Sequence, residues 1–123
     1  MRAIVLAFAL FAAFATSALA APAEILSVRA IPVGSDKWDF EVEVRHPDEG
    51  WDHYADGWDV LTPDGQVVLG TRTLYHPHVE EQPFTRALSG VAVPRDIDEV
   101  ILRAHCSLDG YAGTQAVTVP LDR

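Results

Sequence analysis

Cysteine is nearly absent from this chain of 123 residues, which contains one, so no disulfide can form within it. Basic residues are also few: 9 lysines and arginines stand against 18 aspartates and glutamates, and the formal net charge is −9. A surface this acidic repels phosphate groups, which makes nucleic acid and anionic membrane faces poor partners. The charge instead favours metal cations and basic ligands.

Long apolar runs are lacking outside the N-terminus. Residues 1–20 comprise Met-Arg, an apolar run from Ala3 to Phe14 and a box of small residues that ends at Ala20. This order predicts a secretory signal peptide that is cleaved after Ala20. The run is shorter than the roughly 20 apolar residues that a membrane-spanning helix needs. We therefore expect the mature protein, residues 21–123, in the periplasm or outside the cell, without insertion into the membrane.

Helical periodicity is hard to find after the signal peptide. Glycine, proline and aspartate recur between short segments that are rich in β-branched and aromatic residues, a pattern typical of all-β domains. There is no internal repeat and no linker. Residues 21–123 are thus predicted to form one all-β domain, a seven-stranded antiparallel sandwich of the immunoglobulin or fibronectin type III kind. The predicted strands cover residues 25–33, 37–46, 57–62, 66–75, 84–91, 99–106 and 115–121.

The antiparallel order of these strands predicts where the polar connections meet. Consecutive antiparallel strands reverse direction, so every second connection lies at the same end of the sandwich. The segments 46–56, 76–83 and 107–114 fall at one end, and loops held on a rigid scaffold are where binding sites occur. That end collects carboxylates, aromatic rings and all five histidines: His46, His53, His76, His78 and His105.

Metal binding is the first hypothesis for this end, because imidazole suits copper and zinc. The predicted ligands are His53, His76 and His78, with His46 as an alternative to His53. Asp52 and Asp56 are predicted to supply charge, or hydrogen bonds that orient the imidazoles. The spacing matches no named zinc motif. The alternative is that these histidines make structural hydrogen bonds or are simply exposed.

The acidic stretch 48–59 allows a calcium loop as a further alternative, since calcium takes six to eight oxygen ligands. The stretch lacks the alternating Asp-x-Asp-x-Asp-Gly pattern. We expect Asp48 and Glu49 within it to be solvated acids that keep the protein soluble.

Aromatic side chains at the same end support a rival hypothesis, a metal-free module that binds a carbohydrate or an envelope protein. Flat aromatic rings bury a large area at low entropic cost. Trp51, Tyr54 and Tyr111 are the residues predicted to contact such a ligand. Trp58 is expected in the core.

Catalytic constellations are not apparent, and no catalytic residue is predicted. No serine has a Gly-x-Ser-x-Gly setting, and no Ser/His/Asp arrangement can be picked out. Cys106 is in phase with the buried face of the strand 99–106, which favours an inert core residue over a nucleophile. His105 faces the opposite way. We therefore expect a binding protein and not an enzyme.

The block His76-Pro77-His78-Val79, followed by Gln82-Pro83-Phe84-Thr85-Arg86, is distinctive. Together with the stretches 51–56 and 109–113, it resembles a small family of secreted bacterial proteins of about this length that have no assigned activity. The resemblance covers most of the mature chain and implies a small exported domain. At His105-Cys106 the chain departs from the family's pattern, so the resemblance gives these two residues no role.

Overall fold

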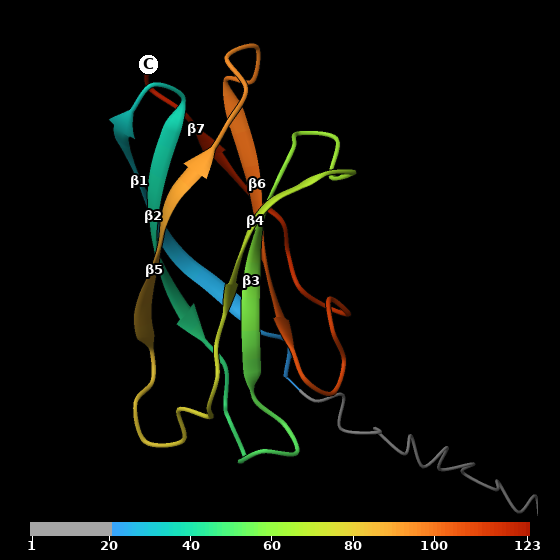
Figure 1. The fold of residues 1–123 in the computed structure, drawn as a ribbon. Helices are drawn as coiled ribbons and strands as arrows, with labels where there is room; N and C mark the ends of the chain where they lie inside the picture. Colours follow the sequence, from blue (N-terminus) through green and yellow to red (C-terminus); the bar gives the residue numbers. More distant parts are fainter. Residues whose placement is uncertain (1–20) are drawn as a thin grey trace, which may run out of the picture.

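Two antiparallel β-sheets pack face to face in the computed structural model, which describes residues 21–123 (Figure 1). The predicted signal peptide, residues 1–20, lies outside the described residues. One sheet has the strand order β1–β2–β5 and the other the order β4–β3–β6–β7. The strands are β1 (Glu24–Gly34), β2 (Lys37–Arg45), β3 (Ala55–Leu61), β4 (Val68–Thr73), β5 (Phe84–Ala92), β6 (Glu99–Cys106) and β7 (Val117–Pro120).

This architecture confirms the predicted all-β sandwich of immunoglobulin/fibronectin type III kind. Alternation of apolar and polar residues produces it, since successive side chains of a strand point to opposite faces of the sheet. On β2 and β6 every second residue is buried between the sheets. These residues are Trp38, Phe40, Val42 and Val44 on β2, and Val100, Leu102, Ala104 and Cys106 on β6.

The core between the sheets is centred on Trp58, whose side chain has no exposed surface, as the sequence predicts. Phe40, Phe84 and Leu102 pack into the same apolar cluster. Burial of each such side chain contributes roughly 1.5–3 kcal/mol. Because the chain cannot form an internal disulfide, this core carries the stability of the domain.

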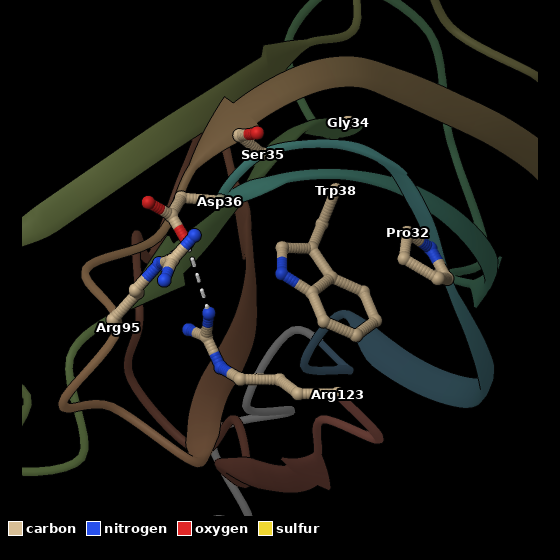
Figure 2. A pocket seen from close by; sticks show the side chains of 7 residues that line it. All are labelled: Pro32, Gly34, Ser35, Asp36, Trp38, Arg95 and Arg123. Atoms are coloured by element: carbon tan, nitrogen blue, oxygen red, sulfur yellow. Dashed lines mark hydrogen bonds and ion pairs between the residues drawn. The ribbon is translucent and has the colours of Figure 1, made fainter.

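The two ends of the sandwich differ in character. The β1–β2, β3–β4 and β5–β6 connections lie at the upper end in Figure 1. A pocket of about 380 Å³ lies at this end, with Trp38 in its wall (Figure 2). Arg95 and Arg123 both pair with one carboxylate oxygen of Asp36 there, at 2.9 and 3.3 Å. Their charges therefore serve an ion-pair network that joins the turns.

The opposite end is formed by the β2–β3, β4–β5 and β6–β7 connections, residues 46–54, 74–83 and 107–116 (Figure 1). We call this end the loop pole. It holds the residues for which the sequence predicts a binding site.

Candidate metal centre

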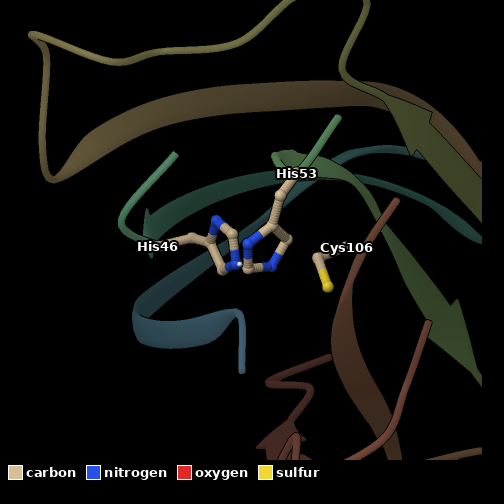
Figure 3. A group of neighbouring side chains, drawn as sticks. All are labelled: His46, His53 and Cys106. Atoms are coloured by element: carbon tan, nitrogen blue, oxygen red, sulfur yellow. Dashed lines mark hydrogen bonds between the residues drawn. The ribbon is translucent and has the colours of Figure 1, made fainter. Parts of the chain in front are cut away.

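Three potential metal ligands meet inside the loop pole: His46, His53 and Cys106 (Figure 3). One ligand atom from each lies within 4.8 Å of the others. All three residues are buried, with 0, 4 and 2% of their surface exposed. The Nε2 atoms of the two imidazoles are 3.1 Å apart, with the rings edge to face. These residues form a compact set of two nitrogen donors and one sulfur donor, which we call the His₂Cys group.

Strand periodicity places two members of this group. His46 directly follows β2 and continues the buried parity of Val42 and Val44. Cys106 ends β6 on the buried face, beside Ala55 of β3. Both side chains therefore point into the end of the core.

A tight turn brings in the third member. The turn runs from Gly50, at a φ of 117° that favours glycine, to His53. The His53 N–H donates to the Gly50 carbonyl at 3.2 Å, and the Glu49 N–H donates to the His53 carbonyl at 2.9 Å. This turn reverses the chain and directs the His53 ring toward His46.

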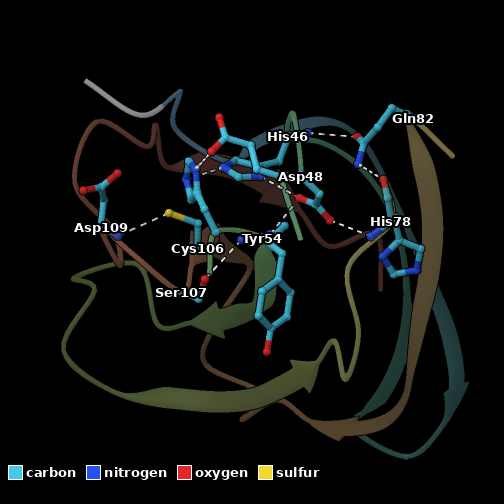
Figure 4. Close-up of polar contacts among 11 residues, drawn as sticks. His46, Asp48, Tyr54, His78, Gln82, Cys106, Ser107 and Asp109 are labelled. Atoms are coloured by element: carbon cyan, nitrogen blue, oxygen red, sulfur yellow. Dashed lines mark hydrogen bonds and ion pairs between the residues drawn. The ribbon is translucent and has the colours of Figure 1, made fainter. Parts of the chain in front are cut away.

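A buried carboxylate orients the His46 ring (Figure 4). The His46 Nδ1–H donates to Asp48 Oδ1 at 2.6 Å, and the same oxygen accepts from the Ala55 N–H at 2.9 Å. Asp48 Oδ2 accepts from the His78 N–H at 2.7 Å. The expectation of a solvated Asp48 is wrong, since its side chain is fully buried. Three hydrogen bonds compensate for that burial.

The second imidazole has a similar but looser arrangement. Oε2 of the exposed Glu49 lies 3.7 Å from His53 Nδ1. Both histidines thus direct Nδ1 toward a carboxylate and Nε2 toward each other. Carboxylate partners on the remote nitrogen are the usual arrangement around metal-binding imidazoles, because they fix the tautomer and raise the basicity of the ligand.

The β6–β7 connection encloses the sulfur. The Asp109 N–H donates to Cys106 Sγ at 3.3 Å, and the backbones of Cys106 and Gly110 form two hydrogen bonds. Ser107 Oγ accepts from the Tyr54 N–H at 3.1 Å, which joins this connection to the β2–β3 connection (Figure 4). The thiol is therefore held by backbone on one side and faces the imidazoles on the other.

Of the predicted ligands, His53 belongs to the His₂Cys group, whereas His76 and His78 lie together elsewhere in the pole, with ring centroids 4.5 Å apart. His78 stacks on Phe84 at 4.0 Å, and its Nε2 accepts from Arg86 Nη2 at 3.0 Å. Burial, followed by the positive charge of Arg86, lowers the pKa of His78. Nε2 of His78 is thus engaged by a cation, whereas its buried Nδ1 has no hydrogen-bond partner among the described residues.

The predicted carboxylates lie elsewhere. Asp52 is exposed, and Asp56 accepts from the Nδ1–H of His105 on the outer face of β6. His105 Nε2 is 3.4 Å from Asp59, which also accepts hydrogen bonds from Tyr111 and Thr71. These residues form a second polar cluster, separated from the His₂Cys group by the sheet.

The pKa values in this outer cluster are shifted, some upward and one downward. The hydrogen bond to Asp59, opposed by burial and aided by Asp56, raises the pKa of His105 above 6.5. Burial raises the pKa of Asp59, but hydrogen bonds from His105, Thr71 and Tyr111 outweigh it and leave that pKa below 3.8. Burial and the hydrogen bond to Asp59 raise the pKa of Tyr111 to about 12.

The aromatic rings that the sequence predicts as a binding surface, those of Trp51, Tyr54 and Tyr111, do not form one flat surface. Trp51 is 68% exposed and meets Tyr54 edge to face, with centroids 5.7 Å apart. The Tyr111 ring is covered by the Arg103 guanidinium at 4.6 Å and touched by His105 at its edge. Trp51 is therefore the member that offers a free aromatic surface.

Sequence reasoning named His46 only as an alternative to His53, and it missed Cys106 and Asp48 as site residues. A signal existed for two of them, because His46 and Cys106 both continue the buried parity of their strands to the same end. Nothing in the local sequence distinguishes Asp48 from its solvated neighbours, since its burial depends on donors from His46, from the start of β3 and from His78, which is 30 residues away.

Comparison with known proteins gives one relative. A protein of Halomicrobium mukohataei named "Putative lipoprotein" is 38% identical to the chain over 97 residues, which are 79% of this chain and 46% of that protein. The chain spans about half the length of the curated relative that it matches. It matches no protein-family model and no solved structure. Within residues 21–123, no helix is long and apolar enough to cross a membrane.

Proposed function

We propose that this chain is an exported, non-enzymatic protein that binds one metal ion, copper or zinc, through His46, His53 and Cys106. The observation that carries the proposal is the convergence of three buried donor atoms within 4.8 Å of one another. Imidazole and thiolate are both ligands of copper and zinc. Carboxylates oriented toward Nδ1 of both histidines support the same function, because they leave the two Nε2 atoms to the metal.

Metal binding at this group is linked to protons. The Nε2 atoms of His46 and His53 face each other across 3.1 Å, and Cys106 has no disulfide partner. A metal ion needs both imidazoles neutral, with their remaining proton on Nδ1, and it replaces the thiol proton of Cys106. Affinity therefore rises with pH, which distinguishes this function from the stacking of a sugar on aromatic rings.

Export rests on two observations. The first 20 residues have the segments of a secretory signal peptide. The similar Halomicrobium protein is named a lipoprotein, which fits an exported protein associated with the cell envelope. We propose the periplasm or the extracellular space as the location, with residues 21–123 as the mature domain.

Calorimetric titration with Cu(II) and Zn(II) tests the proposed function. Wild-type protein is compared with His53→Gln, in which the amide retains volume and polarity, and with a double variant, His76→Ala/His78→Ala. We expect stoichiometric binding by wild type and by the double variant, and its loss in His53→Gln. Circular dichroism of all three proteins establishes that they remain folded.

Other outcomes of the titration are equally informative. Loss of binding in the double variant, with retention in His53→Gln, would move the metal to His76 and His78. If wild-type protein binds neither metal over the whole range from pH 6 to pH 8, the metal function is rejected.

The exposed Trp51 favours a second candidate function, binding of a glycan or an envelope protein at the loop pole. Stacking of a ligand on this ring would quench or shift its fluorescence. Titration of metal-free protein with glycans, alongside Trp51→Ala, tests this function. A fluorescence change that is independent of pH and absent from the variant is the expected result.

A further inference from the structure

We propose that the His₂Cys group holds copper, bound in a three-coordinate arrangement through the Cys106 thiolate and the Nε2 atoms of His46 and His53. This inference rests on the metal-binding function proposed above and names the metal and its bonding. It is argued from the number of donors, their spacing, the buried charge and the single thiol.

The number of donors favours copper over zinc. Structural zinc sites have four protein ligands in a tetrahedron, and zinc sites with three protein ligands hold a water in the fourth position, whereas two imidazoles and one thiolate form the trigonal set typical of copper. Within residues 21–123 the group consists of three donors. Asp48 lies on the Nδ1 side of His46 and is saturated by three hydrogen bonds, so it is not placed to become a fourth.

The spacing of the donors suits one ion. Metal–nitrogen bonds of about 2.0–2.1 Å and a metal–sulfur bond of about 2.3 Å place trigonal donors roughly 3.5–3.8 Å apart. The two Nε2 atoms are 3.1 Å apart, and all three donors lie within 4.8 Å. Side-chain shifts of about 1 Å or less complete the site, which is within the reach of rotamer adjustment at a loop.

Buried charge favours a divalent ion at this position. Asp48 is a fully buried carboxylate in contact with a ligand imidazole. The charges of Cu(II), the Cys106 thiolate and the Asp48 carboxylate sum to zero. A neutral set avoids the large cost of leaving net charge in a buried site.

Because the chain has a single thiol, Cu(II) cannot oxidise its own thiolate ligand to an internal disulfide. Free Cu(II) oxidises thiols by pairing two sulfurs as a disulfide, while two copper ions are reduced to Cu(I). This chain has one cysteine, and that cysteine is buried, so a second sulfur cannot reach it while the protein is folded. The Cu(II)–thiolate bond is therefore expected to persist.

Titration with Cu(II) followed by visible spectroscopy tests the inference. The full-length chain is expressed in an exporting bacterial host, purified, reduced and freed of metal. Addition of Cu(II) is expected to produce an intense visible band, from charge transfer between the thiolate and Cu(II), that reaches its end point at one equivalent. Cys106→Ser should lose the band, whereas His76→Ala should retain it. A roughly tenfold excess of Zn(II) should not displace the copper.

Electron paramagnetic resonance of the wild-type copper protein provides a measurement that needs no variant, because a covalent Cu–thiolate bond narrows the copper hyperfine splitting. Copper bound with identical spectra in wild type and Cys106→Ser would overturn the inference and remove Cys106 from the proposed metal site, while metal binding by the protein would stand. Tighter binding of Zn(II) than of copper would overturn the inference and leave the proposed metal function intact. Failure of both metals to bind would overturn both proposals.

Discussion

Asp48 is the residue on which the geometry of the candidate site depends most. Its two oxygens accept hydrogen bonds from the His46 ring and from the backbones of Ala55 and His78. One side chain thus fixes the tautomer of a ligand, the start of β3 and the path of the β4–β5 connection. Because the Asp48 side chain is fully buried, loss of any of these hydrogen bonds leaves a donor without a partner and costs free energy of unfolding.

Asp48→Asn is expected to weaken metal binding by roughly 10–100-fold, as is usual when the partner of a metal-binding histidine is lost. An asparagine amide presents one oxygen, and its NH₂ group would face a donor. The fold should also lose roughly 1–3 kcal/mol, since a buried hydrogen-bond donor is left without its acceptor. Calorimetry measures the first effect and urea unfolding of the metal-free protein measures the second.

Glu49→Gln is the matched control, because Glu49 is exposed and lies 3.7 Å from its histidine. It should change the stability by less than about 0.5 kcal/mol. Equal effects of the two substitutions would show that Asp48 does not position His46 in solution.

The outer cluster around Asp59 predicts how stability depends on pH. His105 has a raised pKa in the fold, so its contribution is complete below its ordinary pKa of 6.5 and is lost as pH rises through the higher folded value. Asp59 has a lowered pKa, so its contribution is present above 3.8 and is lost as pH falls through the lower folded value. The contribution of this cluster to the stability of the metal-free protein should therefore be greatest between pH 3.8 and pH 6.5.

Melting temperatures of metal-free wild type and Asp59→Asn between pH 3 and pH 9 check this dependence. Removal of the carboxylate takes away the largest cause of the His105 shift. The variant should therefore melt lower at pH 5 and lose less stability than wild type between pH 6 and pH 9. Parallel curves for the two proteins would show that the cluster does not control this part of the profile.

At the scale of elements, alternation of side chains was sufficient to predict β2 and β6, and the predicted β6 agrees with the structure at both ends. The predicted β4, residues 66–75, is too long at both ends. Asp64 accepts from the Gln66 N–H, and Thr62 Oγ1 accepts from the Val67 N–H. Such side-chain bonds to the backbone compete with strand pairing, and apolar patterns do not reveal them.

The same reasoning predicted the loop pole but not the group inside it. Antiparallel order alone brings three connections to one end of the sandwich. Which side chains then turn inward depends on the Gly50 turn and on Asp48, and neither has a periodic signal. Proximity in sequence suggested His76 and His78, whereas the structure joins His53 to residues 7 and 53 positions away, His46 and Cys106.

We predict that β3 requires glycine at position 57, because β4 and the His105 side chain of β6 lie too close for a Cβ atom. A Cβ atom on Gly57 would lie 2.7 Å from the Arg72 carbonyl oxygen of β4 and 2.7 Å from Cε1 of His105. Gly57→Ala should therefore separate the strands locally and destabilise the fold by about 1–3 kcal/mol. Urea unfolding measures the change.

Gly34→Ala in β1 is the control, since an added Cβ there meets nothing within 4 Å. Its effect should stay within about 0.5 kcal/mol. A stable Gly57→Ala protein would mean that β3 and β4 can separate without cost at this point.

At the scale of the whole molecule, the sandwich of about a hundred residues has no internal disulfide to stabilise it. The apolar core is continuous between the sheets, but the loop pole is held by hydrogen bonds among His46, Asp48, His78 and Gln82. A metal bound to the His₂Cys group would cross-link the β2–β3 connection to the end of β6. It would thereby join the two sheets at the end where the core stops.

Metal binding should consequently stabilise the entire fold. An ion that binds the folded chain alone adds about 2.7 kcal/mol when its free concentration is 100 times the Kd. In a domain of this size, 1 kcal/mol shifts the Tm by roughly 4–8 °C, so the expected increase is roughly 10–20 °C. Calorimetric melting with and without Cu(II) measures it, and a chelator should reverse it. The increase should vanish in Cys106→Ser, because the link to β6 is lost, and an equal increase in that variant would place the stabilising metal elsewhere in the chain.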